Sequence, residues 1–232
     1  MIQESIKQVR ANIEAACKRV GRDPSEVTLI CVSKTKPDEA VMEAYETGER
    51  FFGENKVQEL VGKIERLPED IHWHLIGHLQ RNKVKYIVGK VDLIHSVDSF
   101  RLAEEINIRA KKENILQPIL IEVNIGEEES KFGVRPEEAK ELVRAISQLD
   151  ALRISGIMCI APYVVEPEDN RQLFHKIKDL AIDIEKEKLD NVSMSILSMG
   201  MTNDYQIAIE EGSTMVRVGT AIFGERSYNK GV

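Results

Sequence analysis

Eight short apolar segments recur along this chain, and stretches with the apolar spacing of helices lie between them. Several of the segments are apolar on both faces, which is typical of parallel strands covered by helices on either side. Eight strand–helix units predict an α/β fold, a single (β/α)8 barrel of the TIM type, preceded by an extra N-terminal helix over residues 2–20. An open, doubly wound sheet is the alternative. The predicted strands span residues 27–34, 51–53, 72–76, 91–95, 119–123, 152–158, 192–197 and 214–218.

The length of the chain suits a barrel without a second unit. It has 232 residues, 42% of them hydrophobic, and a TIM barrel typically takes about 250 residues. Neither a Pro/Gly/Ser-rich linker nor a change in composition divides it. We therefore expect one domain over residues 1–232, and a monomer, because no exposed apolar heptad suggests a partner helix.

Charge and cysteine usage limit the class of protein. The net charge is -7 and basic residues are interspersed with acidic ones, which argues against a nucleic-acid partner. Cys17, Cys31 and Cys159 lie in apolar surroundings, without zinc or disulfide spacing, as expected in a reducing compartment. No signal peptide is apparent, and the longest uncharged stretches fall short of the ~20 apolar residues of a membrane span. We expect a soluble, cytoplasmic protein with no membrane partner.

Lys34 closes the first predicted strand, at the end of the barrel where active sites of this fold lie. A lysine there can form a Schiff base with an aldehyde if its pKa is lowered, although most strand-end lysines are simply solvated. Lys36 is the rival amine. Alternation does not separate the two, because both share the parity of Ile30 and Val32, but Lys36 lies farther beyond the strand.

The last predicted strand carries Arg217 between two valines, followed by Gly219 and Thr220. An arginine in such a strand needs an anionic or acceptor partner, of which an ion pair with a glutamate is the simplest. The glycine allows close approach of the backbone, and the turn that Thr220 begins offers N–H groups to a phosphate. Ser198 and the backbone of Gly200, after strand seven, would supply the facing half of this phosphate site. An amine together with a phosphate cradle suits pyridoxal 5'-phosphate (PLP).

Five motifs in this chain resemble those of the pyridoxal phosphate homeostasis proteins, single-domain relatives of the barrel half of alanine racemase. They cover residues 32–37, 52–59, 74–83, 197–202 and 212–224, in the same order and over almost the whole chain. The resemblance implies PLP as cofactor, bound as an internal aldimine on Lys34. It further implies a phosphate held by Ser198, Gly219 and Thr220, a ring nitrogen facing Arg217, and Asn55 near the ring or its lysine.

The resemblance favours a carrier over an enzyme. Arginine stays protonated, so a ring nitrogen facing Arg217 remains neutral and the ring is a poor electron sink. Alanine racemase adds a second domain with a catalytic tyrosine, whereas only fifteen residues follow Arg217 here. We therefore expect a protein without a catalytic residue that holds or buffers PLP in vitamin B6 homeostasis, with PLP-dependent apo-enzymes as recipients. The alternative is a PLP-dependent racemase, or a related enzyme, of low activity that uses Lys34.

The histidines are weaker candidates for a functional site than Lys34 and Arg217. His72, His74 and His78 could suggest a metal, but no closed ligand set appears at the expected spacing, so we expect none. His78 receives no role, because relatives often carry another residue there. His95 is interpreted as an ordinary strand-end histidine. Lys131 stands where the racemases carry a cofactor-contacting arginine, which would place positive charge near the ring.

Overall fold

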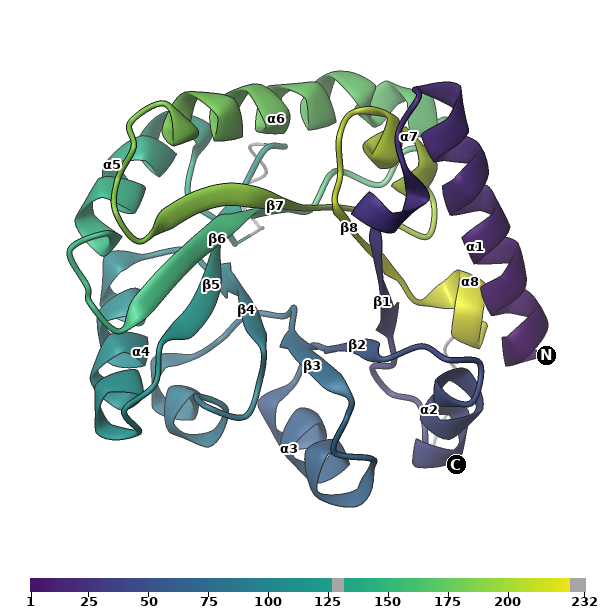
Figure 1. Ribbon diagram of the computed structural model, residues 1–232, viewed down its shortest axis with the longest axis horizontal. Helices are drawn as coiled ribbons and strands as arrows, with labels where there is room; N and C mark the ends of the chain where they lie inside the picture. Colours follow the sequence, from purple (N-terminus) through teal and green to yellow (C-terminus); the bar gives the residue numbers. More distant parts are fainter. Residues whose placement is uncertain (127–131, 226–232) are drawn as a thin grey trace, which may run out of the picture.

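The structure is a computed structural model that describes residues 1–126 and 132–225. Eight parallel strands pair in sequence order and close into a barrel, which Figure 1 shows as a ring with helices outside it. The barrel prediction is confirmed, and the open sheet is excluded. The strands are β1 (Thr28–Val32), β2 (Phe51–Glu54), β3 (His72–Leu75), β4 (Leu93–Val97), β5 (Gln117–Val123), β6 (Leu152–Cys159), β7 (Val192–Met201) and β8 (Met215–Val218).

Alternate residues of the strands divide the core into two parts, as the pleat of a strand requires. Side chains such as Ile30, Leu120 and Met158 form a small cluster inside the barrel. Their neighbours, such as Leu29 and Ile121, belong to the larger core between the strands and the helices. Both faces are therefore apolar, which is why the segments are recognisable in the sequence.

The helices surround the ring, and the extra N-terminal helix is confirmed: α1 packs against α7 and α8. Two stretches differ from expectation, because residues 81–86 form a 3₁₀ helix and a short helix follows β8. The helices are α1 (Ile2–Arg19), η1 (Pro24–Glu26), α2 (Asp38–Tyr45), α3 (Val57–Arg66), η2 (Arg81–Tyr86), α4 (Phe100–Lys112), α5 (Pro136–Ile146), η3 (Pro167–Asn170), α6 (Arg171–Glu185), α7 (Tyr205–Glu210) and α8 (Thr220–Phe223). Within the described ranges, none of them is long and apolar enough to cross a bilayer.

Several strand ends differ from the predicted ones by one or more residues, and the changes in β1 and β7 affect the candidate site. β1 ends at Val32, because the carbonyl of Ser33 accepts from the N–H of Lys36 at 3.0 Å and closes a turn around Lys34. β7 continues to Met201, so Ser198 and Gly200 lie within the strand and not after it.

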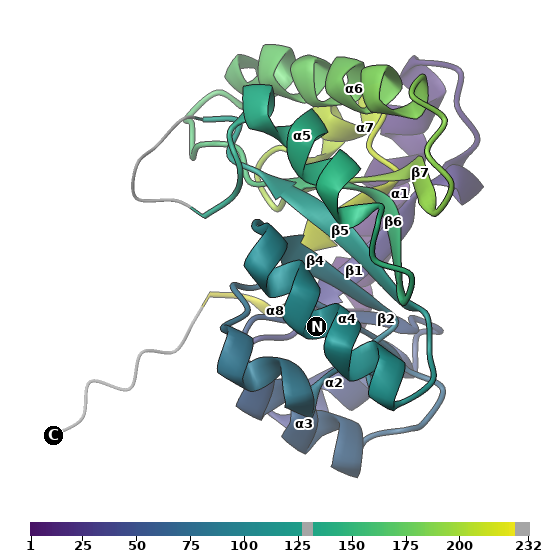
Figure 2. The same cartoon turned by 90° about the vertical axis from the view of Figure 1, so that its left-hand side faces the viewer.

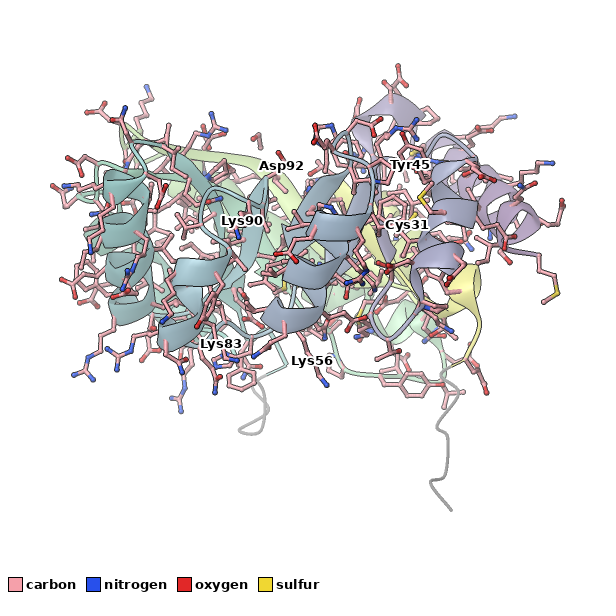
Figure 3. All side chains as sticks on the ribbon, turned by 90° about the horizontal axis from the view of Figure 1, so that it is seen from below. Cys31, Tyr45, Lys56, Lys83, Lys90 and Asp92 are labelled. Atoms are coloured by element: carbon pink, nitrogen blue, oxygen red, sulfur yellow. The ribbon has the colours of Figure 1, made fainter. Side chains whose placement is uncertain are left out.

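The barrel has two distinct ends. Lys56 and Lys83, which follow β2 and β3, lie at one end, and Asp92 and Tyr45, which precede β4 and β2, lie at the other (Figure 3). The end toward which the strands run, here called the mouth, is the one that holds active sites in this fold. The side view in Figure 2 places α8 at the mouth as well.

Candidate functional site

The turn after β1 carries both candidate amines, and their surroundings separate them. Lys34 is half-buried and lies in the turn that follows β1, just beyond Val32, which lines the barrel interior. The amine of Lys36 instead donates to the carbonyls of Phe223 at 2.7 Å, Gly224 at 3.2 Å and Glu225 at 3.0 Å. Lys36 thus caps the end of α8, which makes it the weaker candidate for a reactive amine.

Arg217 of β8 lies inside the barrel and is 4% exposed. Its Nη1 donates to Ser198 Oγ at 2.6 Å and its Nη2 donates to the carbonyl of Cys159 at 2.8 Å. Burial lowers the pKa of the guanidinium, and the charges of Glu122 and Asp204 act in the opposite direction. The partners of Arg217 are thus a hydroxyl and a carbonyl, and the glutamate ion pair considered from the sequence is not found among the described residues.

Ser198 connects Arg217 to two histidines that the sequence did not single out as a pair. His95 Nδ1 lies 3.0 Å from Ser198 Oγ, and His95 Nε2 lies 2.8 Å from His74 Nδ1. Burial lowers the pKa of His74 to about 3 and that of His95 well below its usual value. Both rings are therefore neutral at pH 7. Interpreting His95 as an ordinary strand-end histidine was wrong, although its parity with Leu93 could have placed it inside the barrel.

The hydroxyl of Ser198 is central to this chain of hydrogen bonds. It accepts from Arg217, and it either donates to His95 Nδ1 or accepts from it, depending on the tautomer of the ring. Only in the second arrangement does its proton stay available for another acceptor. The phosphate contact predicted for Ser198 stays a prediction, and its observed partners place it beside Arg217.

The start of α8 lies against the end of β1. Gly219 is the residue before the helix, and a Cβ built there would lie 3.3 Å from the carbonyl oxygen and 3.4 Å from the Cβ of Val32. Such a contact is tight, so glycine lets the turn lie close to the Lys34 segment. Thr220 is exposed at the mouth. Thr202 Oγ1 accepts from the N–H of Ala221 at 3.4 Å, and the sequence analysis missed this residue although the 197–202 motif contains it.

Gly200 has a packing role in addition to any contact with a ligand. Its φ is +92°, and a Cβ there would lie 2.6 Å from Ala208 Cβ and 2.8 Å from Tyr205 Cα. Only glycine combines this conformation with such close packing of β7 on α7. The predicted contact of its backbone with a phosphate is not tested by this geometry.

Oδ1 of Asn55 and Oε2 of Glu122 are among the buried side-chain oxygens that have no hydrogen-bond partner within the described residues. Buried polar atoms are rarely left without a partner, so each is available to a polar ligand. Glu122 is 5% exposed and shares its face of β5 with Leu120. Burial and, to a smaller extent, the charge of Asp98 raise the pKa of Glu122 against the opposing charge of Arg217, to about 7.

Other sequence candidates lie apart from this group. His72 lies 3.2 Å from Asp92 at the end opposite the mouth, and His78 stacks on Phe132 with ring centroids 3.7 Å apart. The part of the chain that the structure describes holds no group of three or more His, Cys, Asp or Glu able to bind a metal. Lys131 lies outside the described residues.

The arrangement fits a ligand with an aldehyde, a ring nitrogen and a phosphate. Lys34 offers the amine, and Arg217 offers a guanidinium without a carboxylate partner among the described residues. The Gly219–Thr220 turn offers backbone N–H groups, and Asn55 holds a buried amide oxygen. These are the groups that PLP requires of a protein.

Comparison with known proteins is consistent with this geometry. The family model of the alanine racemase N-terminal domain matches residues 5–227. A pyridoxal phosphate homeostasis protein of Aquifex aeolicus is 48% identical over 226 residues, which are 97% of this chain and 98% of the relative. The structure of PipY of Synechococcus elongatus with PLP bound is 34% identical, with a TM-score of 0.83, over 97% of this chain and all of PipY.

A more distant likeness concerns the fold alone. Alanine racemase of Clostridium difficile 630 is 14% identical, with a TM-score of 0.74, and the match covers 98% of this chain but 57% of the racemase.

Proposed function

The chain belongs to the pyridoxal phosphate homeostasis proteins, within the alanine racemase N-terminal domain family, and from that premise we propose that it binds PLP at the mouth and buffers its concentration. The observation that carries the proposal is Arg217, a buried guanidinium with neutral partners. A buried cation of this kind is completed by an acceptor on a ligand. PipY, whose structure contains PLP, supports the choice of ligand.

In this proposal each group at the mouth has one task. Lys34 would hold the cofactor covalently, its amine nitrogen bonding to the aldehyde carbon with loss of one water. Arg217 donates to the ring nitrogen, which keeps that nitrogen unprotonated. Gly219 and Thr220 bind the phosphate through backbone N–H groups, and Asn55 orients the ring or the lysine. PLP supplies an electrophilic carbonyl on an aromatic ring when bound.

The histidines inside the barrel support a role as carrier. The interior histidines are neutral because burial lowers the pKa of His74 to about 3 and that of His95 well below its usual value, so neither can act as a general acid there. We propose that the chain is one cofactor-binding domain and acts as a monomer in the cytoplasm. Its recipients would be PLP-dependent apo-enzymes.

Glu122 supports a second candidate function, a PLP-dependent racemase or related enzyme of low activity. Burial raises the pKa of Glu122 to about 7, which suits a group that takes up and releases protons at neutral pH. It shares the barrel interior with Arg217. The two candidates differ in whether amino acids are turned over.

The deciding experiment combines spectroscopy with trapping. The absorption spectrum of the purified protein with PLP should show a band of a lysine-bound cofactor, and borohydride should fix the cofactor on the peptide that contains Lys34. Lys34→Ala should abolish both, whereas Lys36→Ala should retain the adduct. A spectrum equal to that of PLP in buffer would refute the proposal. Steady racemisation or loss of an amino-acid α-hydrogen in D₂O, abolished by Lys34→Ala and reduced by Glu122→Gln, would establish the second candidate instead.

A further inference from the structure

A buried ion cluster lies behind the turn that carries Lys34, on the side of the barrel wall that faces α3. Lys63 of α3 is 2% exposed, and its amine lies 2.7 Å from Glu54 Oε1 and 2.9 Å from Glu59 Oε1. Glu54, the last residue of β2, is fully buried. Glu54 and Glu59 both belong to the 52–59 motif, and neither has a task in the proposed binding of PLP.

The cluster holds the residues on both sides of Lys34. The hydroxyl of Ser33 donates to Glu54 Oε1 at 2.6 Å, and the carbonyl of Ser33 accepts from Lys63 Nζ at 2.8 Å. The N–H of Thr35 donates to Glu59 Oε1 at 2.6 Å. Hydrogen bonds that involve charged groups are about twice as strong as neutral ones, so these contacts fix the backbone on either side.

The backbone of the turn needs such support. Thr35 has a φ of +64°, a conformation that is unfavourable for a β-branched residue and persists only where surrounding contacts impose it. Ser33 faces the cluster, and Lys34 lies between Ser33 and Thr35, the two residues that the cluster holds. If Thr35 were released to a negative φ, the direction of Lys34 would change.

We infer that Ser33, Glu54, Glu59 and Lys63 form a clamp, whose function is to aim the amine of Lys34 into the mouth. Glu59 and Lys63 are positioning residues, because they act on the amine through the backbone and do not touch the ligand. The inference rests on the proposed function for the identity of the ligand. The direction of Lys34 itself is a property of the protein alone.

The competing explanation is that the cluster only stabilises the packing of α3 on β2. The chain offers a matched control for it, since Glu49 is also buried and accepts two hydrogen bonds from Arg10 of α1. That pair contacts none of the residues of the Lys34 turn in the described structure. A variant there should affect stability without affecting the amine.

The test uses Glu59→Leu, which removes the acceptor of the Thr35 N–H, and Glu59→Gln, which retains an acceptor of similar size. The side chain of Glu59 is 22% exposed, so both should fold, as the melting temperature will show. We measure the rate at which PLP and borohydride modify the peptide that contains Lys34. Misplacement by about 1 Å can cost on the order of 100-fold in rate, so we expect at least about a tenfold loss in the leucine variant.

Glu59→Gln should restore the rate to within about threefold of the wild type, and Glu49→Gln should leave the rate unchanged even if it lowers the melting temperature. A folded Glu59→Leu protein that forms the Lys34 adduct at the wild-type rate overturns the inference. If the leucine variant does not fold, Ser33→Ala takes its place, with the same expected and contrary results.

A second readout needs no cofactor. Brief reductive methylation with formaldehyde, followed by peptide mass analysis, reports the relative reactivity of Lys34 and Lys36. Glu59→Leu should change the ratio at least about threefold, and an unchanged ratio contradicts the clamp. If the wild type forms no PLP adduct but its methylation ratio responds to Glu59→Leu, the proposed function fails while the clamp stands.

Discussion

Two buried polar groups flank the mouth, and they are built on opposite principles. The clamp outside the barrel wall pairs one cation with two carboxylates, and Lys63 reaches both within 2.9 Å. The interior chain, formed by His74, His95, Ser198 and Arg217, links one cation to neutral partners only. Both are largely removed from water.

The difference indicates what each group is for. In the clamp, the amine of Lys63 is paired with the carboxylates of Glu54 and Glu59, so we assign the clamp a structural task. In the interior chain, Arg217 has no carboxylate partner among the described residues, and the histidines are neutral because burial lowers their pKa values. A buried cation is costly unless its N–H groups find hydrogen-bond acceptors. The interior chain is therefore the part that a ligand completes.

The largest effect should come from breaking the clamp at its cation. Lys63→Met leaves Glu54 buried without its partner, and burial already raises the pKa of that carboxyl while Lys63 opposes the rise. Removing one partner of a buried pair costs about 3–5 kcal/mol, so the free energy of unfolding in urea should fall by about that amount. Adding Glu54→Gln should recover part of the loss. A loss below about 1 kcal/mol would mean that the clamp is not an ionic unit.

The next effect concerns Glu122 and depends on pH. Burial raises its pKa to about 7, above the value of about 4.3 in an unfolded chain. The wild type therefore loses stability as the pH rises from about 4.3 to 7, because the unfolded state releases this proton first. Glu122→Gln cannot titrate, so its unfolding free energy relative to the wild type should increase by about 3 kcal/mol between pH 4 and pH 8. Urea titrations at both pH values measure this, and parallel pH profiles would show that Glu122 is not desolvated.

The sequence predicted the barrel well because the signal is local: apolar segments such as 119–123 are recognisable without knowing their neighbours. Arg217 and Lys34 were recognisable because each stands out from an apolar strand. The clamp was not, since Glu59 and Lys63 have the i,i+4 spacing of an ordinary solvated pair on a helix. Their burial depends on Ser33 and Glu54, which two other elements bring to them.

Of the hydrogen-bonded residues inside the barrel, the sequence analysis singled out Ser198 and Arg217 but not their contact with His95. Ser198 and Arg217 were expected to act separately, one on the phosphate and one on the ring, whereas their side chains are 2.6 Å apart. The position of His95 between Ser198 and His74 depends on the stagger of the closed barrel, which strand parity alone does not give. Contacts across a barrel are a property of its closure.

Ser198→Ala tests the interior chain and should cost less than breaking the clamp. It leaves Arg217 Nη1 and His95 Nδ1 without their shared partner, while Arg217 keeps the Cys159 carbonyl. An unpartnered buried polar group costs about 1–3 kcal/mol, and we expect a loss in that range by urea denaturation. Ser195→Ala, at an exposed position of the same strand, is the control and should change stability by less than about 0.5 kcal/mol. Equal losses of stability in the two variants would contradict a stabilising role for the hydrogen bonds of Ser198.

The smallest effect should come from the rim of the mouth. Thr202→Val keeps the shape of the side chain but removes the oxygen that accepts from the N–H of Ala221 at 3.4 Å. A bond of that length is weak, so the unfolding free energy should fall by less than about 1 kcal/mol. The exposed Thr220→Val is the matched control. If Thr202→Val were more damaging than Ser198→Ala, the rim would be the part that holds the mouth together, and the contrast between a mechanical clamp and a ligand-facing interior would no longer describe this site.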